Sequence, residues 1–159
     1  MFGVAFIISA CSWEPVYYRK STNMPVKTAA IDILPIPEEI GRLLVQQLKD
    51  LLNPQNEKVQ KHYSLSISLT ENVYTDQGIL EDNTSTRATM QITANFKLKE
   101  KDKLLLDDST FAASSYNILM TPYPSVTTEN TTRKRLVDML ADKIAMRLAV
   151  YFNNQVDKK

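Results

Sequence analysis

The stretch from Thr86 to Lys99 alternates between apolar or small residues and polar residues along its whole length. A period of two predicts a β-strand with one buried and one wet face, since successive side chains point to opposite sides of a sheet. Tyr63–Thr70 shows the same alternation, and Leu104–Tyr116 returns as a further strand after a polar turn. These three strands predict a sheet with a single apolar face.

Two helices complete the predicted fold. Pro37–Leu52 and Val126–Phe152 place leucines and other apolar residues at helical spacing, and a short apolar strand at Ala29–Leu34 precedes the first helix. The order strand, helix, three strands, helix predicts an α+β fold, with both helices packed on one face of a four-stranded sheet.

The N-terminus carries a lipoprotein signature. An apolar run leads to Ile8-Ser9-Ala10-Cys11, a lipobox whose cysteine becomes acylated after cleavage, so we expect the domain to be lipid-anchored. The run is short and has no preceding Lys or Arg, which indicates a start upstream; the alternative is a buried apolar N-terminus. We therefore expect a signal segment at 1–10, the palmitate-type anchor and a tether at 11–28, one domain at 29–153, and a polar tail at 154–159.

The composition argues against an enzyme. Cys11 is the only cysteine, His62 is the only histidine, and there are three glycines, which excludes thiolate and multi-histidine metal sites and phosphate-binding loops. His62 has no serine motif or carboxylate pair to orient it, so we expect a surface histidine. A formal net charge of +1 gives no global field for nucleic acid. No cofactor and no metal are expected.

Several segments resemble a known family when taken in order. They are the lipobox with Trp13–Tyr17, then Ile31–Arg42, Thr84–Ala88, and Ala113–Asn117 before Pro122-Tyr123. Together they resemble the LPS-assembly lipoprotein LptE family. The resemblance implies two helices on a four-stranded sheet and a non-enzymatic role as a plug that helps an LptD-type outer-membrane β-barrel to assemble. It also implies binding of lipopolysaccharide on its way to the cell surface.

Basic residues supply the candidate contacts with lipopolysaccharide. Lys97, Lys99, Lys101 and Lys103 alternate through the end of one strand and its turn, and Arg87 lies on the wet face of the same strand. If the resemblance holds, ammonium groups here would hold lipid A phosphates as point charges. The alternative is a solvated hairpin in which lysines oppose aggregation.

Candidate partner contacts lie at the second helix. We expect Arg133, Lys134 and Arg135 to open this helix, where cations oppose the macrodipole and therefore suggest an anionic partner. Tyr116, Pro122 and Tyr123 form a stiff aromatic connection that either meets the barrel wall or caps the core. A solvated basic turn is the alternative for the cations.

Ser12 follows the cysteine where some bacteria use aspartate for inner-membrane retention, so we expect the periplasmic face of the outer membrane. The competing function is a lipoprotein accessory subunit of a phospholipid or solute transport complex. A lipid-anchored hydrolase that depends on His62 is the weakest interpretation.

Overall fold

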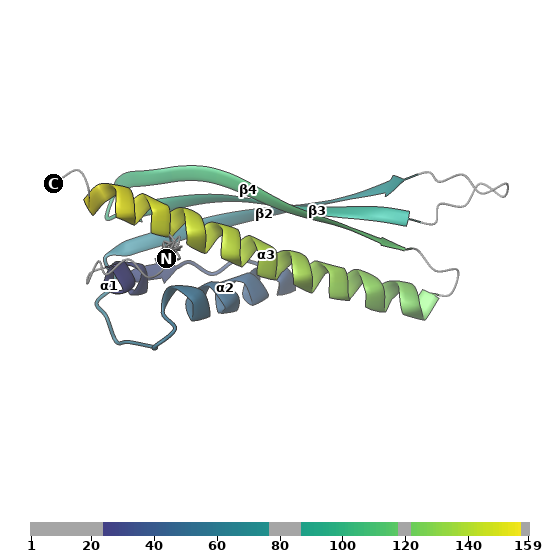
Figure 1. The fold of residues 1–159 in the computed structure, drawn as a ribbon, viewed down its shortest axis with the longest axis horizontal. Coiled ribbons are helices and arrows are strands. Elements are labelled where there is room, and N and C mark those ends of the chain that lie inside the picture. Colours follow the sequence, from purple (N-terminus) through teal and green to yellow (C-terminus); the bar gives the residue numbers. More distant parts are fainter. Residues whose placement is uncertain (1–23, 77–86, 118–121, 157–159) are drawn as a thin grey trace, which may run out of the picture.

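The computed structural model describes residues 24–76, 87–117 and 122–156 and confirms the α+β fold (Figure 1). The helices are α1 (Met24–Ala29), α2 (Glu38–Leu52) and α3 (Pro122–Val156). The strands are β1 (Ile31–Ile33), β2 (Tyr63–Asp76), β3 (Arg87–Glu100) and β4 (Lys103–Asn117). Residues 1–23, including the lipobox and Cys11, lie outside the described residues.

The four strands form one sheet in the order β1-β2-β3-β4. β1 runs parallel to β2, and the other neighbours are antiparallel. The predicted alternation of β3 is confirmed, because every even residue from Ala88 to Leu98 is buried while the odd residues are exposed or half-buried. The register pairs Leu65 with Leu98 and Ile67 with Phe96, which places the apolar residues of both strands on the same face.

The core lies between that apolar face and the two long helices, which cross the sheet on one side (Figure 1). α2 buries Leu44, Leu48 and Leu52. The buried residues of α3 recur at helical spacing: Leu136, Val137, Leu140, Ala141, Ile144, Leu148 and Phe152. Both helical faces predicted from the sequence are therefore confirmed.

The structure differs from the expected boundaries at the start of the domain. A short helix, α1, occupies Met24–Ala29 at the end of the predicted tether, and β1 is limited to Ile31–Ile33. Ala29 and Ala30, the first two residues of the predicted strand, are buried but precede β1.

The second long helix is also longer than predicted. α3 begins at Pro122, so the proline-containing segment 122–124 forms its first turn instead of ending before it. Proline is well tolerated there, because the first helical N–H groups have no intrahelical acceptor. The helix continues to Val156, and among the described residues no helix is long and apolar enough to cross a bilayer.

One close approach fixes the start of α2. A Cβ atom on Gly41 would lie 2.6 Å from Cγ2 and 2.8 Å from the carbonyl oxygen of Ile36. Glycine is the only residue without a Cβ, so Gly41 lets the helix pack tightly on the segment that leads from β1.

Candidate interaction surfaces

The sheet face that points away from the helices carries an uncharged surface. In register order its members are Ser68, Asn95 and Ser109; Thr70, Thr93 and Phe111; Asn72, Gln91 and Ala113; and Tyr74, Thr89 and Ser115. We call this set the uncharged face. Tyr74 and Phe111 are 52% and 56% exposed on it. Hydroxyls, amides and two aromatic rings suit contact with another polar but uncharged surface.

The uncharged face ends at a lysine-rich hairpin formed by the end of β3 and the start of β4. Lys97, Lys99, Lys101 and Lys103 are all exposed, as predicted from the sequence. Lys97 Nζ lies 3.1 Å from the Asp107 carboxylate. Residues 97–108 contain four lysines and four acidic residues, so the lysine-rich hairpin has no net positive charge.

Arg87 does not join that hairpin. It is the first residue of β3, ten residues before Lys97 on the same face. At about 3.4 Å per residue the two positions are about 34 Å apart, so one small anion cannot contact both. Arg87 and Lys97 do share one face of β3, as the sequence predicts, but they lie at opposite ends of the strand.

Arg133 is the centre of an internal cluster that joins α3 to β2. Its guanidinium donates to both Glu71 oxygens, at 3.0 Å from Nε and 2.8 Å from Nη2, and to Glu129 at 2.7 Å. Asn130 accepts a further hydrogen bond at 3.0 Å. The Glu71 hydrogen bonds are the main reason that the pKa of Arg133 is raised above its usual value, although burial opposes the shift.

This cluster corrects the expectation that Arg133, Lys134 and Arg135 open the helix. α3 begins at Pro122, so all three residues lie well past its first turn, where the macrodipole argument no longer applies. Arg133 is half-buried and is held by Glu71 and Glu129, and its contact with a partner stays a prediction. Lys134 and Arg135 are exposed.

The other proposed partner residues lie near the same end. Tyr116 is half-buried against the core, and burial raises its pKa, helped by the nearby Glu129 and Glu71 carboxylates while Arg133 opposes the shift. Pro122 and Tyr123 belong to the first turn of α3, but their side chains are outside the described residues.

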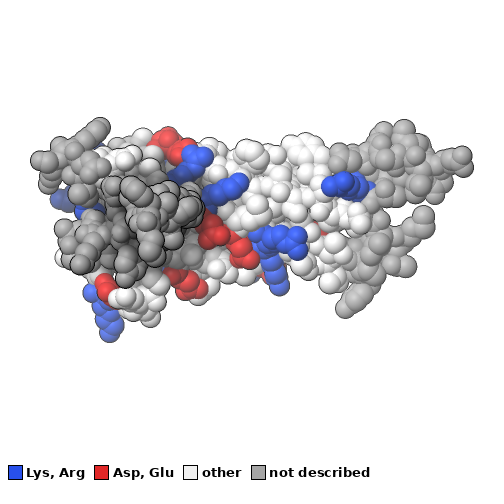
Figure 2. Space-filling model, in the orientation of Figure 1, with Lys and Arg blue, Asp and Glu red and all other residues white. Residues whose placement is uncertain are grey.

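Charged side chains are unevenly distributed over the face shown in Figure 2. Among the described residues on this face, they gather over the half that carries α1 and α2.

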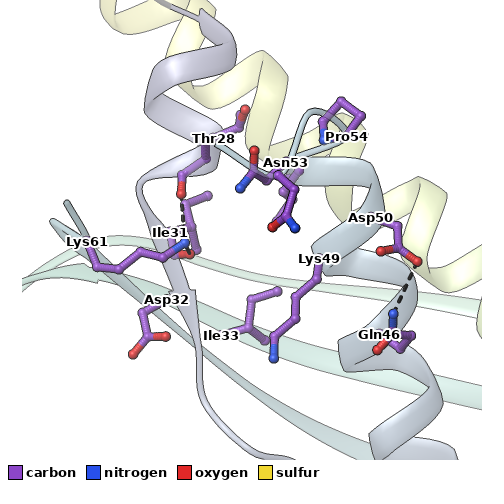
Figure 3. A pocket seen from close by; sticks show the side chains of 13 residues that line it. Thr28, Ile31, Asp32, Ile33, Gln46, Lys49, Asp50, Asn53, Pro54 and Lys61 are labelled. Carbon is purple, nitrogen blue, oxygen red and sulfur yellow. Dashed lines mark hydrogen bonds between the residues drawn. The ribbon is translucent and has the colours of Figure 1, made fainter. Parts of the chain in front are cut away.

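A cavity of about 650 Å³ lies between α1, β1 and the end of α2 (Figure 3). Lys61 Nζ donates to the carbonyls of Ala29 and Ile31 at 2.7 and 2.9 Å, which fixes the chain at this wall. Lys49, Asp32 and Asp50 add charges of both signs to the lining. The mixed lining selects no single class of ligand.

Nothing in the described part of the chain assembles a metal centre, because no three His, Cys, Asp or Glu side chains are grouped there. His62 is exposed at the start of β2, and its backbone N–H donates to the Ala30 carbonyl at 3.0 Å.

Two residues escaped the sequence analysis. Glu71 lies just past the alternating stretch Tyr63–Thr70 and carries no signal of its own, although it is the main partner of Arg133. Lys143 belongs to the second long helix, and its Nζ donates to the Phe111 carbonyl on β4 at 2.7 Å. Both partners are distant in sequence, so no local pattern indicates them.

Comparisons with known proteins agree on one fold. A family model described as LptE, lipopolysaccharide-assembly, matches residues 26–148. An uncharacterized protein of Rickettsia prowazekii (strain Madrid E) is 29% identical over 92% of this chain and 91% of its own length.

Three crystal structures share the fold. A lipoprotein from Caulobacter crescentus CB15 has a TM-score of 0.66 at 20% identity and covers 84% of this chain and 97% of its own. The minor lipoprotein from Acinetobacter baumannii has a TM-score of 0.63 at 20% identity, with coverages of 77% and 92%. The rare lipoprotein B from Shewanella oneidensis has a TM-score of 0.59 at 13% identity, with coverages of 78% and 98%. At these identities the likeness establishes the fold alone.

Proposed function

Because the chain belongs to the LptE family of lipopolysaccharide-assembly proteins, we propose that it is an outer-membrane lipoprotein that plugs an LptD-type β-barrel and helps that barrel to assemble. In this role it assists the insertion of lipopolysaccharide at the cell surface. The role is not enzymatic, in keeping with the family. The observation that carries the proposal is the family match over residues 26–148, which includes all four strands and most of α3.

The uncharged face supports the plug role. The lumen of an outer-membrane barrel is polar, so a plug has to present groups that exchange hydrogen bonds with it. Hydroxyl and amide side chains such as Thr70, Gln91 and Asn95 do this without the cost of desolvating a charge. Tyr74 and Phe111 add two exposed rings that can be buried against the barrel wall.

The lysine-rich hairpin is the proposed contact with lipopolysaccharide phosphates. Lys99, Lys101 and Lys103 are its exposed cations, whereas Lys97 is already 3.1 Å from Asp107. Reversal of these three lysines to glutamate should weaken binding of purified lipopolysaccharide, and reversal of Arg87, about 34 Å away, serves as the comparison. Equal loss from both variants would contradict a local site at the hairpin.

The proposed anchor is tested through Cys11. Cys11→Ser removes the acylated thiol, so radiolabelled palmitate should no longer enter the protein and the chain should leave the membrane fraction. Palmitate label that persists in Cys11→Ser would contradict acylation at this residue.

The decisive experiment is affinity purification of the C-terminally tagged lipoprotein from detergent-solubilised outer membranes, with quantitative mass spectrometry of its partners. An LptD-type barrel in a one-to-one ratio is the expected result. Subunits of a phospholipid or solute transporter, recovered instead of a barrel, would overturn the plug role and establish the accessory function.

A further inference from the structure

The two edges of the sheet are built differently. β1 forms one edge with three residues, while β4 forms the other with fifteen. The outward N–H and C=O groups of an edge strand are a template for another strand, and proteins usually blunt a long edge with proline, charges or bulges. The stretch Ser109–Asn117 of β4 contains no proline and no charged residue. The sequence of this stretch therefore supplies neither proline nor charge to protect the long edge.

One contact shows which residues of β4 point outward. Lys143 Nζ, from α3, donates to the Phe111 carbonyl at 2.7 Å and lies 5.5 Å from the centre of the Phe111 ring. The N–H and C=O of one residue point to the same side of a strand, and this side alternates. Ser109, Phe111, Ala113 and Ser115 therefore direct their backbone groups away from β3.

An apolar and basic helix face runs beside this edge. Arg135, Met139, Lys143, Met146 and Val150 follow one another at intervals of four, four, three and four residues, so they share one side of α3. Lys143 reaches β4, which places this side of the helix along the edge. Met139, Met146 and Val150 are 38%, 51% and 45% exposed, although their neighbours on α3 are buried.

The edge and the helix side thus lie next to each other, with outward backbone hydrogen-bonding groups on the strand and exposed methionines on the helix. An added strand would pair with β4 and turn alternate side chains onto Met139 and Met146, whose flexible thioethers adapt to varied partners. The opposite side chains would extend the uncharged face.

Charge decides between two possible partners of this edge. A second copy of β4, paired antiparallel about Phe111, would bring two Lys143 ammonium groups to one edge, which is unfavourable. Arg147 is held by Asp108, so Lys143 is the charge that an incoming strand would meet first. A strand from a different protein that carries a carboxylate there would complement it.

We propose that the outer edge of β4 is a strand-addition site for an extended segment that alternates apolar and polar residues and carries a carboxylate opposite Lys143. This assignment rests on the proposed function: the segment belongs to the barrel protein that the chain plugs. Backbone pairing then supplies affinity, and the methionine-lined helix side supplies selectivity.

The test uses Ala113→Pro. This change removes the outward N–H of Ala113, which does not donate to β3, and such edge positions tolerate proline. Lys143→Glu reverses the complementary charge. Lys58→Glu, in the exposed loop before β2 on the β1 side of the sheet, is the matched control. Each tagged full-length variant is purified from outer membranes, and thermal unfolding confirms that it folds.

We expect Ala113→Pro and Lys143→Glu each to retain at most about one tenth of the barrel retained by the wild type and by Lys58→Glu, since several backbone hydrogen bonds depend on the edge. A photo-crosslinker at Ala113 should then map to one extended barrel segment. Wild-type retention by both edge variants would overturn strand addition while leaving the plug role intact. A wild-type protein that retains no barrel would overturn the plug role, and with it the assigned strand donor.

Discussion

The two ends of the molecule are stabilised in different ways. At one end α2 and α3 both cover the sheet; we call this the two-helix end. The start of α2 meets the sheet near Glu71 and Ile92, and it meets α3 near Asn130 and Arg133. Beyond this point α3 alone covers the strands, and we call that part the one-helix end.

Large, fully buried side chains occur at both ends. The two-helix end contains Leu44, Leu65, Phe96, Leu98 and Leu148. At the one-helix end Met90 is likewise fully buried, and Ala88 is a small buried residue.

Large apolar residues stay accessible at the one-helix end. Val73 and Val126 are 49% and 56% exposed there. Large apolar residues are exposed to a similar degree at the two-helix end, among them Leu51, Met146 and Val150 at 43%, 51% and 45%. The two ends therefore differ in how many helices cover the sheet, and both leave apolar residues accessible to a partner.

The largest effect should come from the centre of the two-helix end. Phe96→Ala removes a fully buried ring beneath both helices and should lower the free energy of unfolding by about 3–5 kcal/mol. Val73→Ala, at a half-exposed position of the other end, should cost below about 1 kcal/mol. Urea denaturation of both variants measures the difference, and equal losses would remove the distinction between the ends.

The next effect tests how closely α2 approaches the chain before it. Gly41→Ala would gain helix propensity. Its Cβ, however, would lie 2.6 Å from the Ile36 Cγ2 and 2.8 Å from the Ile36 carbonyl oxygen, and the backbone oxygen cannot rotate away. We expect a net loss of about 1–3 kcal/mol, measured by urea denaturation. A stabilised variant would show that the contact relaxes freely, and that Gly41 does not determine how α2 is seated.

The sequence predicted most of the two-helix end, because its signals are local. Alternation along β3 identified which residues face the core, and helical spacing in α2 identified Leu44 and Leu48. The start of α3 was placed too late, because Pro122 and Pro124 look the same in sequence whether they precede a helix or form its first turn.

Contacts that join distant segments were less predictable at either end. Arg133 and Glu71 are 62 residues apart, and neither residue carries a sign of its partner. The lysines of the β3–β4 hairpin were found, but the ion pair of Lys97 depends on the register that places Asp107 opposite it. Whether they bind lipopolysaccharide remains a prediction.

The third effect tests the cluster where the two ends meet. Arg133→Met keeps the length of the side chain but leaves the Glu71 and Glu129 carboxylates without their shared cation. Their side chains are 25% and 38% exposed, so water offsets part of the loss, and we expect a cost of about 1–2 kcal/mol.

Amide hydrogen exchange locates this effect. Faster exchange in Pro122–Asn130 and in the end of β2, with the two-helix end unchanged, is the expected pattern. Uniformly faster exchange would show that the two ends unfold as one unit. The Glu71→Gln and Glu129→Gln double variant, which removes the like-charge pair, should recover part of the stability of Arg133→Met.

The smallest effect is a pH dependence that belongs to the two-helix end. The hydrogen bond from Arg147 is the main cause that lowers the pKa of Asp108 below its ordinary 3.8, with help from the Ser109 N–H against the opposing effect of burial. The unfolded chain therefore binds this proton at a higher pH than the folded chain. The contribution to stability is complete above about pH 5 and is lost as the pH falls through 3.8 and then through the lowered folded pKa. Because the side chains of Asp108 and Arg147 are 30% and 45% exposed, this contribution to stability should stay below about 1 kcal/mol.

The test compares two variants. Arg147→Met should have a lower urea midpoint than the wild type at pH 7, and the two midpoints should converge near pH 2. Lys97→Met, at the more exposed pair with Asp107, should change the midpoint less. If Arg147→Met differed equally from the wild type at both pH values, the side chain would act through packing along α3, and charge would add nothing to the way this end is held.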